Sequence, residues 1–150
     1  MKHELQIELR KRYPYFYREC VRTRHQVNVM TGADVLDQED LEPFDEQGIE
    51  CGDGWFDLID RLSFACEAEI QVLVAQGFSQ DVWPRAAQIK EKFGGLRFYV
   101  RGAVSEGLRA LIQQAESEAS FQICERCGAD GRLRPGRWSH TCCDPCSLTG

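Results

Sequence analysis

The chain contains Cys124-Glu-Arg-Cys127-Gly128 and then Cys143-Asp-Pro-Cys146, with fifteen residues between the two cysteine pairs. Two C-x2-C pairs at such a separation are typical of a structural zinc site. Four thiolates close a tetrahedron around Zn²⁺ and leave no open position for a substrate. The sequence therefore predicts a zinc-binding module over residues 121–150, with Zn²⁺ as a structural cofactor. Its predicted ligands are Cys124, Cys127, Cys143 and Cys146.

The second ligand pair leaves a choice open. Cys142 adjoins Cys143, and His140 lies close by, so either side chain can replace Cys143 in principle. Cys143 is favoured because it repeats the two-residue spacing of the first pair.

The residues between the two pairs indicate a hairpin. Residues 131–140 predict a short β-hairpin that turns at Pro135-Gly136, because this dipeptide is a strong turn signal. We expect Trp138 to pack over the metal-binding turns.

The eight cysteines have a second interpretation as four disulfides of a secreted protein. However, residues 1–10 contain no apolar segment of the kind found in signal peptides. A chain of 150 residues can also bury an adequate core without covalent links. We therefore expect reduced thiols and a cytoplasmic location. The cysteines outside the zinc site are expected to act as small hydrophobic side chains; they are Cys20, Cys51, Cys66 and Cys142.

Length and composition predict one compact unit, either a single domain or a core over 1–120 followed by the zinc module over 121–150. No apolar run approaches the roughly 18 residues that a membrane-spanning helix needs. The net charge of −6 argues against general, sequence-independent binding to nucleic acid. The charge is unevenly distributed, however: residues 1–32 carry +4, 33–60 carry −11 and 82–101 carry +4.

Hydrophobic periodicity predicts four helices. One covers residues 2–12, and a second begins with Pro14 at its first position. Asp53 is the expected N-cap of the third, and Gly77 is expected to end it. Ser105 is expected to cap the fourth. Residues 31–54 form an acidic connector without periodicity. The apolar stripe expected for the third helix consists of Trp55, Ile59, Leu62, Cys66, Ile70 and Leu73.

Residues 87–100 predict a β-hairpin with Gly94-Gly95 as a two-residue turn. This turn places Lys92 opposite Arg97 and Phe93 opposite Leu96. One face of the hairpin then carries the apolar side chains Ile89, Phe93, Leu96, Phe98 and Val100. The other face, which we call the basic face, carries Lys90, Lys92, Arg97, Tyr99 and Arg101. The predicted fold class is α+β, with helices packed on a small antiparallel sheet and a zinc-ribbon-like or treble-clef-like C-terminus.

The basic face is the best candidate surface for binding. Like charges directly opposite each other on a hairpin are destabilising unless an anion lies between them. That anion can be the acidic segment 33–60 of the chain itself, or an external polyanion such as a nucleic acid. The candidates for contacts with a partner or nucleic acid are the five basic-face residues together with Asp53 and Trp55.

Glu91 is the exception on the apolar face, where an unpaired carboxylate is costly. One interpretation places it near the open edge of the sheet or pairs it with an arginine such as Arg61. The other makes it part of a metal-dependent hydrolase or nuclease site with Asp53, Asp57 or Asp60. The sequence signatures of zinc deaminases, α/β-hydrolases and P-loop enzymes are absent. No catalytic residue is assigned, and the sequence favours a protein that is not an enzyme.

Three sequence strings are similar to those of a family of small, functionally uncharacterised proteins of bacteria and of phages or prophages. They are Cys51-Gly-Asp-Gly-Trp55, Gln88-Ile-Lys-Glu-Lys-Phe-Gly-Gly-Leu-Arg-Phe-Tyr99 and Cys124-Glu-Arg-Cys127-Gly128. The resemblance spans roughly residues 44–146. It implies a cytoplasmic protein with a C-terminal zinc site, often encoded on mobile elements. In similar chains a histidine can stand at the position of Cys146, which supports Cys143 and Cys146 as the second pair.

These observations lead to three functional hypotheses. The first is a small, zinc-stabilised binding protein of a phage or mobile element that modulates a host protein or a protein–nucleic-acid complex. The second is direct binding of nucleic acid by the basic face. The third is the metal-dependent hydrolase or nuclease that uses Glu91 and the carboxylates of residues 53–60.

Overall fold

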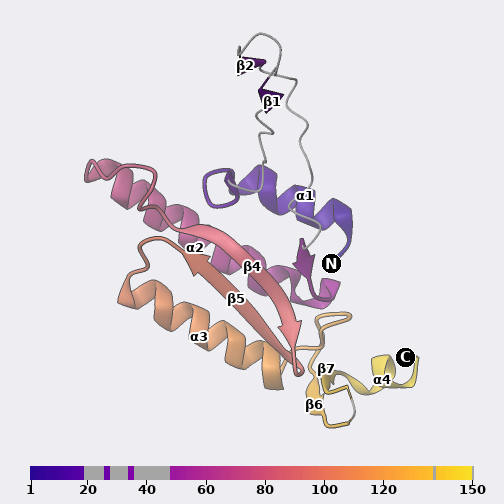
Figure 1. Ribbon diagram of the computed structural model, residues 1–150. Coiled ribbons are helices and arrows are strands. Elements are labelled where there is room, and N and C mark those ends of the chain that lie inside the picture. Colours follow the sequence, from indigo (N-terminus) through magenta and orange to yellow (C-terminus); the bar gives the residue numbers. More distant parts are fainter. Residues whose placement is uncertain (19–25, 28–33, 36–47, 137, 150) are drawn as a thin grey trace.

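The computed structural model describes residues 1–18, 26–27, 34–35, 48–136 and 138–149. It confirms the α+β class: helices pack with small sheets, and a C-terminal hairpin holds the four-cysteine cluster (Figure 1). The helices are α1 (His3–Arg12), the 3₁₀-helix η2 (Asp53–Trp55), α2 (Phe56–Ala75), α3 (Glu106–Phe121) and α4 (Asp144–Leu148). The strands are β1 (Gln26–Val27), β2 (Asp34–Val35), β3 (Ile49–Glu50), β4 (Arg85–Lys92), β5 (Gly95–Arg101), β6 (Arg132–Arg134) and β7 (His140–Cys142).

The central sheet is mixed and has the strand order β3-β4-β5. Strands β4 and β5 form the predicted antiparallel hairpin, with a register shift between Ala86 and Gln88. Strand β3 adds a short parallel pairing in which Ile49 lies opposite Ile89. The prediction of a purely antiparallel sheet missed this strand, because two residues are too few to show the alternation that identifies a strand.

The predicted register of the hairpin is wrong by two positions. Lys92 pairs with Gly95 and Lys90 with Arg97, so the turn consists of Phe93 and Gly94 instead of two glycines. Both turn residues have positive φ, +55° at Phe93 and +82° at Gly94. A shift of two keeps the side chains of the paired strand residues on their expected faces, since side chains alternate with a period of two. Only Phe93 leaves the apolar face and becomes exposed.

Two contacts explain why the turn forms one residue earlier than expected. The Glu91 carboxylate accepts a hydrogen bond of 2.5 Å from the N–H of Gly94, which closes the turn over that residue. Gly95 lies against α3, where an added Cβ would stand 2.3 Å from the Ser120 hydroxyl. Gly95 is therefore used for its small size within the strand, and the conformational freedom of Gly94 serves the turn.

The helix predictions have mixed outcomes at their ends. The helix over 2–12 is confirmed by α1, but residues 14–17 form turns instead of the helix expected from Pro14. The third helix is confirmed by α2, and Gly77 follows it at φ +80° as predicted. The fourth is confirmed by α3, where the Ser105 hydroxyl accepts a hydrogen bond from the N–H of Leu108.

The prediction of Asp53 as the N-cap of α2 is wrong. Asp53 begins the 3₁₀-helix that precedes α2, and its carboxylate accepts a hydrogen bond from the N–H of Lys2 at 2.7 Å. The Lys2 ammonium also pairs with it at 3.1 Å. These contacts with Lys2, led by the backbone hydrogen bond, lower the pKa of Asp53. The residue ties α1 to the start of α2.

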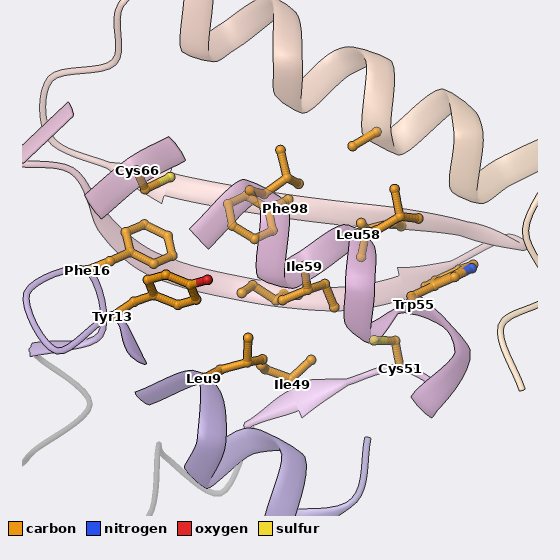
Figure 2. Close-up of a cluster of buried hydrophobic side chains, with 14 of the residues drawn as sticks. Leu9, Tyr13, Phe16, Ile49, Cys51, Trp55, Leu58, Ile59, Cys66 and Phe98 are labelled. Atoms are coloured by element: carbon orange, nitrogen blue, oxygen red, sulfur yellow. The ribbon is translucent and has the colours of Figure 1, made fainter. Parts of the chain in front are cut away.

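Helices α1, α2 and α3 and the apolar face of the sheet together enclose the core (Figures 1 and 2). Figure 2 shows Trp55 at one end of this cluster, with Cys66 and Phe16 toward the other. Five of the six stripe residues predicted for α2 are buried, and Leu73 is half-buried. Helix α3 covers the outer edge of β5, where Glu116 accepts a 2.8 Å hydrogen bond from the N–H of Phe98. This contact satisfies a donor at the edge of the sheet.

None of the helices in the described part of the chain is both long and apolar enough to cross a lipid bilayer. Most of the acidic connector predicted over 31–54 lies outside the described residues. Its described end, from Gly48 onward, enters β3 and the 3₁₀-helix.

Candidate metal centre

The four predicted zinc ligands converge in the structure. The Sγ atoms of Cys124, Cys127, Cys143 and Cys146 all lie within 4.8 Å of one another, and those of Cys127 and Cys143 are 3.6 Å apart. A tetrahedral Zn²⁺ with Zn–S bonds of about 2.3 Å needs sulfur atoms about 3.8 Å apart. The donor set and its spacing therefore fit a structural zinc ion. The division of the chain into a core over 1–120 and a module over 121–150 stays a prediction.

The first cysteine pair lies on a tight turn. Gly128 adopts φ +78° and donates its N–H to the carbonyl oxygen of Cys124 at 2.9 Å. Because the left-handed region favours glycine, this residue lets the backbone fold back directly after Cys127. The turn thereby directs two thiols to the same point.

The second pair lies at the start of a helix. Cys143 is the N-cap of α4, and its sulfur accepts a hydrogen bond of 3.4 Å from the N–H of Cys146. Pro145 stands in the first turn of α4, where its missing N–H costs nothing. The first turn and the start of α4 thus supply the ligands, and the β6–β7 hairpin connects them. This arrangement matches the treble-clef-like form of the prediction, since the second pair comes from a helix.

Hydrogen bonds within the cluster shift the pKa values of its thiols in opposite directions. Burial raises the pKa of Cys124, but hydrogen bonds from the N–H groups of Cys143, Cys127 and Arg126 outweigh it and lower that pKa to about 6. Hydrogen bonds with the thiols of Cys143 and Cys127 raise the pKa of Cys146 to about 12. A metal ion would release such shared protons, because only thiolates act as ligands.

The structure decides between the alternatives for the third ligand. Cys143 belongs to the cluster, whereas Cys142 is buried in β7 and neither it nor His140 joins the four sulfurs. His140 is exposed, with its Nδ1 at 3.1 Å from the carbonyl oxygen of Trp138. The hairpin of β6 and β7 is confirmed, with Pro135-Gly136 in its loop. The expected packing of Trp138 over the cluster is wrong, since this side chain is 81% exposed.

The first metal-binding turn rests on the Gly52-Asp-Gly-Trp55 loop. The N–H of Gly54 donates a 2.7 Å hydrogen bond to the carbonyl oxygen of Glu125, and the Trp55 indole donates one of 3.0 Å to Ile123. The Glu125 carboxylate accepts a hydrogen bond of 2.8 Å from the N–H of Gly52. We call this contact of 52–55 with 123–128 the loop–knuckle contact.

The loop–knuckle contact has no room for side chains at the two glycines. A Cβ on Gly54 would lie 2.2 Å from the carbonyl oxygen of Cys124 and 2.4 Å from the nitrogen of Gly128. A Cβ on Gly52 would lie 2.2 Å from the carbonyl oxygen of Glu125. The glycines were visible in the sequence, but their partner, the backbone of the metal-binding turn, was not.

The structure places the candidate binding residues in different environments. Trp55 is fully buried and Asp53 is bonded to Lys2, so the loop–knuckle contact accounts for the Gly-Asp-Gly-Trp string without a ligand. Lys90, Lys92, Arg97, Tyr99 and Arg101 do share one side of the β4–β5 hairpin. Lys92, Tyr99 and Arg101 are exposed, and the other two are half-buried. A hollow on this side is lined by Ala87, Gln88, Tyr99, Val100 and Arg101.

Three of the carboxylates proposed for a hydrolase, Glu91, Asp53 and Asp60, are used in other contacts. Glu91 accepts from the N–H of Gly94 and is not paired with Arg61, which instead bonds Glu118 at 2.9 Å. Asp60 accepts hydrogen bonds from Arg12 and Tyr13, both at 2.9 Å. Within the described ranges, the four cysteines are the only group of three or more His, Cys, Asp or Glu side chains that lie close enough together to share a metal ion.

What the chain shows is thus a four-cysteine cluster fit for zinc, fastened to the helical core through the loop–knuckle contact. Comparisons with protein-family models, with curated proteins and with solved structures find no match to this chain.

Proposed function

We propose that this chain is a non-catalytic binding protein whose fold is completed by a structural zinc ion. The observation that carries the proposal is the four-cysteine cluster, which has four protein donors and is packed against the core at Gly54. Catalytic zinc sites keep a position for water or substrate, whereas sites with four cysteines are closed. The zinc would act through folding, by holding the β6–β7 hairpin and α4 together.

The proposed target is a host protein or a protein–nucleic-acid complex in the cytoplasm of a bacterium. Two features support this choice. The resemblance to phage and prophage proteins favours a role in modulating cellular machinery. The basic face supplies a charged surface for contact, which suits recognition of an anionic partner. The acidic segment 33–60 is a second candidate surface, but 36–47 lie outside the described residues.

A second candidate function is direct binding of nucleic acid through the basic face. The specific observation in its favour is the arrangement of Lys92, Tyr99 and Arg101, which are exposed on the same side of the hairpin. Cations beside an aromatic ring can contact phosphates and stack on a base. The third hypothesis, a metal-dependent hydrolase, receives no support from the positions of its carboxylates.

The test is affinity capture of the zinc-loaded, tagged protein from bacterial cytoplasm, divided into nuclease-treated and untreated halves. A control variant, Lys92→Glu with Arg101→Glu, reverses charges on the basic face and leaves the cysteines intact. A partner that survives nuclease and is lost with the variant supports protein binding through this face. Capture that disappears with nuclease supports the second candidate. A preparation that binds zinc and captures nothing in either half contradicts the proposed function.

A further inference from the structure

The β4–β5 turn contains the least expected backbone conformation in the described chain. Phe93 is the only non-glycine residue with positive φ among the described residues, at +55°. Two-residue turns of this kind favour Asn, Asp or Gly at the first position, because a side chain with a Cβ is strained there. Phe93 gains little burial in return, since 75% of the side chain is exposed. A strained, exposed aromatic residue calls for a functional explanation.

Phe93 stands at the end of the basic face. The Lys92 ammonium lies 5.3 Å from the centre of the Phe93 ring, so this ring borders the cationic side of the hairpin. Further along the strands, Lys90 pairs in register with Arg97, and Gln88 with Tyr99. Tyr99 is 45% exposed. Gln88, which lies opposite Tyr99, is five residues from Phe93, and a strand of that length extends about 17 Å. The rings of Tyr99 and Phe93 are therefore separated by about the length of a short oligonucleotide segment.

The cations of this surface form no ion pairs within the part of the chain that the structure describes. No described carboxylate forms an ion pair with Lys90, Lys92, Arg97 or Arg101. Lys90 and Arg97 are like charges in direct register, which is unfavourable without a counter-charge. Glu50 lies beside Lys90 in β3 and moderates the charge only at that position. An external polyanion would supply the missing negative charge.

We propose that Phe93, Lys92, Lys90, Arg97 and Tyr99 form a binding strip for single-stranded nucleic acid. The two rings would stack on bases, and the cations would contact the phosphates between them. A duplex fits less well, because its bases are stacked on each other and present no free faces. This inference rests on the second candidate function, binding of nucleic acid through the basic face, and names its ligand class.

The β6–β7 hairpin, which precedes the second cysteine pair, holds this strip in position. The Thr141 hydroxyl, which has one proton to share, lies 2.7 Å from the carbonyl oxygen of Gly94 and 2.9 Å from that of Ser120. At Gly94 an added Cβ would stand 2.4 Å from the Leu133 side chain. The turn that presents Phe93 is therefore clamped between α3 and β6–β7. A turn that is already rigid loses less conformational entropy when a ligand binds. Zinc binding, which stabilises this hairpin, should therefore increase the affinity of the strip for its ligand.

The test measures fluorescence anisotropy of labelled, mixed-sequence 12-mers: single-stranded DNA, single-stranded RNA and the matching duplex. The zinc-loaded protein is compared with Phe93→Asn, Phe93→Ala and Lys92→Ala with Arg97→Ala. The matched control is Phe64→Ala, since Phe64 is also exposed, at 64%, but lies on α2. Thermal melts of each variant accompany the binding curves.

We expect Phe93→Asn and Phe93→Ala to weaken single-strand binding about 5- to 100-fold, as the loss of one stacked base implies. Phe93→Asn should also raise the melting temperature, because asparagine tolerates the left-handed conformation. The double variant should reduce the salt slope by about 1.4, that is, about 0.7 for each lost phosphate contact on a single strand. Phe64→Ala should bind like the original protein.

Four outcomes would overturn this inference: unchanged binding by Phe93→Asn, an equal loss with Phe64→Ala, equal affinity for the duplex, or no binding of either single strand. In the last case, a nuclease-resistant protein partner from the capture experiment would leave the proposed function standing. The proposed function and the single-strand binding strip are therefore tested by different measurements. DNA and RNA arms identify which single strand the strip prefers.

Discussion

The amide of Gly54 donates a 2.7 Å hydrogen bond to the carbonyl oxygen of Glu125, and this contact joins the helical core to the metal-binding turn. The two residues lie in separate sequence motifs, Gly-Asp-Gly-Trp and Cys-Glu-Arg-Cys-Gly. Their contact makes the zinc cluster part of the structural framework.

Gly54→Ala should destabilise the protein and weaken its hold on zinc. The new methyl group would overlap the carbonyl oxygen of Cys124, so the turn must move. Overpacking of this kind costs about 1–3 kcal/mol. The measurements are the melting temperature and the rate of zinc transfer to a coloured chelator. Gly136→Ala is the control, because a Cβ there meets nothing within 4 Å. Equal behaviour of both variants would contradict the role of the loop–knuckle contact.

Cys143→Ser should abolish stoichiometric zinc binding, whereas Cys142→Ser and His140→Ala should retain it. Cys143 lies in the sulfur cluster, and the other two residues lie outside it. Cys142→Ser should still lower the melting temperature, because a hydroxyl replaces a buried, apolar sulfur. Elemental analysis of the purified variants gives the zinc content per chain. Zinc retained by Cys143→Ser but lost from His140→Ala would reassign the ligand.

Removing zinc should unfold at least residues 121–150. In structural sites of this type, the free energy of metal binding is also free energy of folding. Hydrogen exchange before and after treatment with a chelator shows which amides lose protection. We also expect lost protection at Gly54, because its acceptor is the carbonyl oxygen of Glu125. A thermal melt that the chelator leaves unchanged would argue against a structural role for the metal.

Thr141→Val should cost about 1–3 kcal/mol, because it removes the single hydroxyl proton that two carbonyl oxygens share. Those oxygens belong to Gly94 and Ser120. Urea unfolding of Thr141→Val beside Thr141→Ser separates the hydroxyl from the methyl group, since serine keeps the hydrogen bonds. Equal losses in both variants would assign the effect to packing alone.

Glu118→Gln should lower stability at pH 7 by at most about 1 kcal/mol, or about 2–4 °C. Hydrogen bonds from Gln114 and then Arg61 lower the pKa of Glu118. A lowered pKa gives stability that is present above the unfolded value, about 4.3, and is lost as the pH falls through the folded value. The difference in stability between the original protein and Glu118→Gln should therefore disappear below about pH 4.

Comparing the two proteins at each pH cancels any loss of metal common to both. Arg61→Gln should reproduce the deficit at pH 7, and the double variant should show less than the sum of the two single losses. A gap that persists at pH 3 would show that Glu118 acts through packing instead of charge.

Local patterns were enough to predict much of this fold. The apolar stripe of α2, the glycine after it, the Ser105 cap and the four ligands each depend on residues close together in sequence or on fixed spacings. The α+β class followed from these elements. The faces of the hairpin were also correct, because alternation survives a shift of two residues.

Long-range partners account for what sequence reasoning missed. Asp53 has the chemistry of an N-cap, but Lys2 competes for its carboxylate from another helix. The glycine pair at 94–95 is a good turn signal, yet Gly95 lies inside β5 close to the Ser120 hydroxyl, and the turn falls on Phe93 and Gly94. The short strand at Ile49 exists only because β4 offers it a partner. None of these neighbours is adjacent in sequence.

The loop–knuckle contact also has a consequence for biosynthesis. The Gly52–Trp55 loop is made long before its partner, and the last ligand, Cys146, follows later still. While the intervening chain is synthesised, at about 5–20 residues per second, the Trp55 indole has no Ile123 carbonyl to bond. The Trp55 end of the core is therefore covered only after the sheet and α3 have been made. The safe maturation of the chain depends on how soon zinc reaches the emerging thiols.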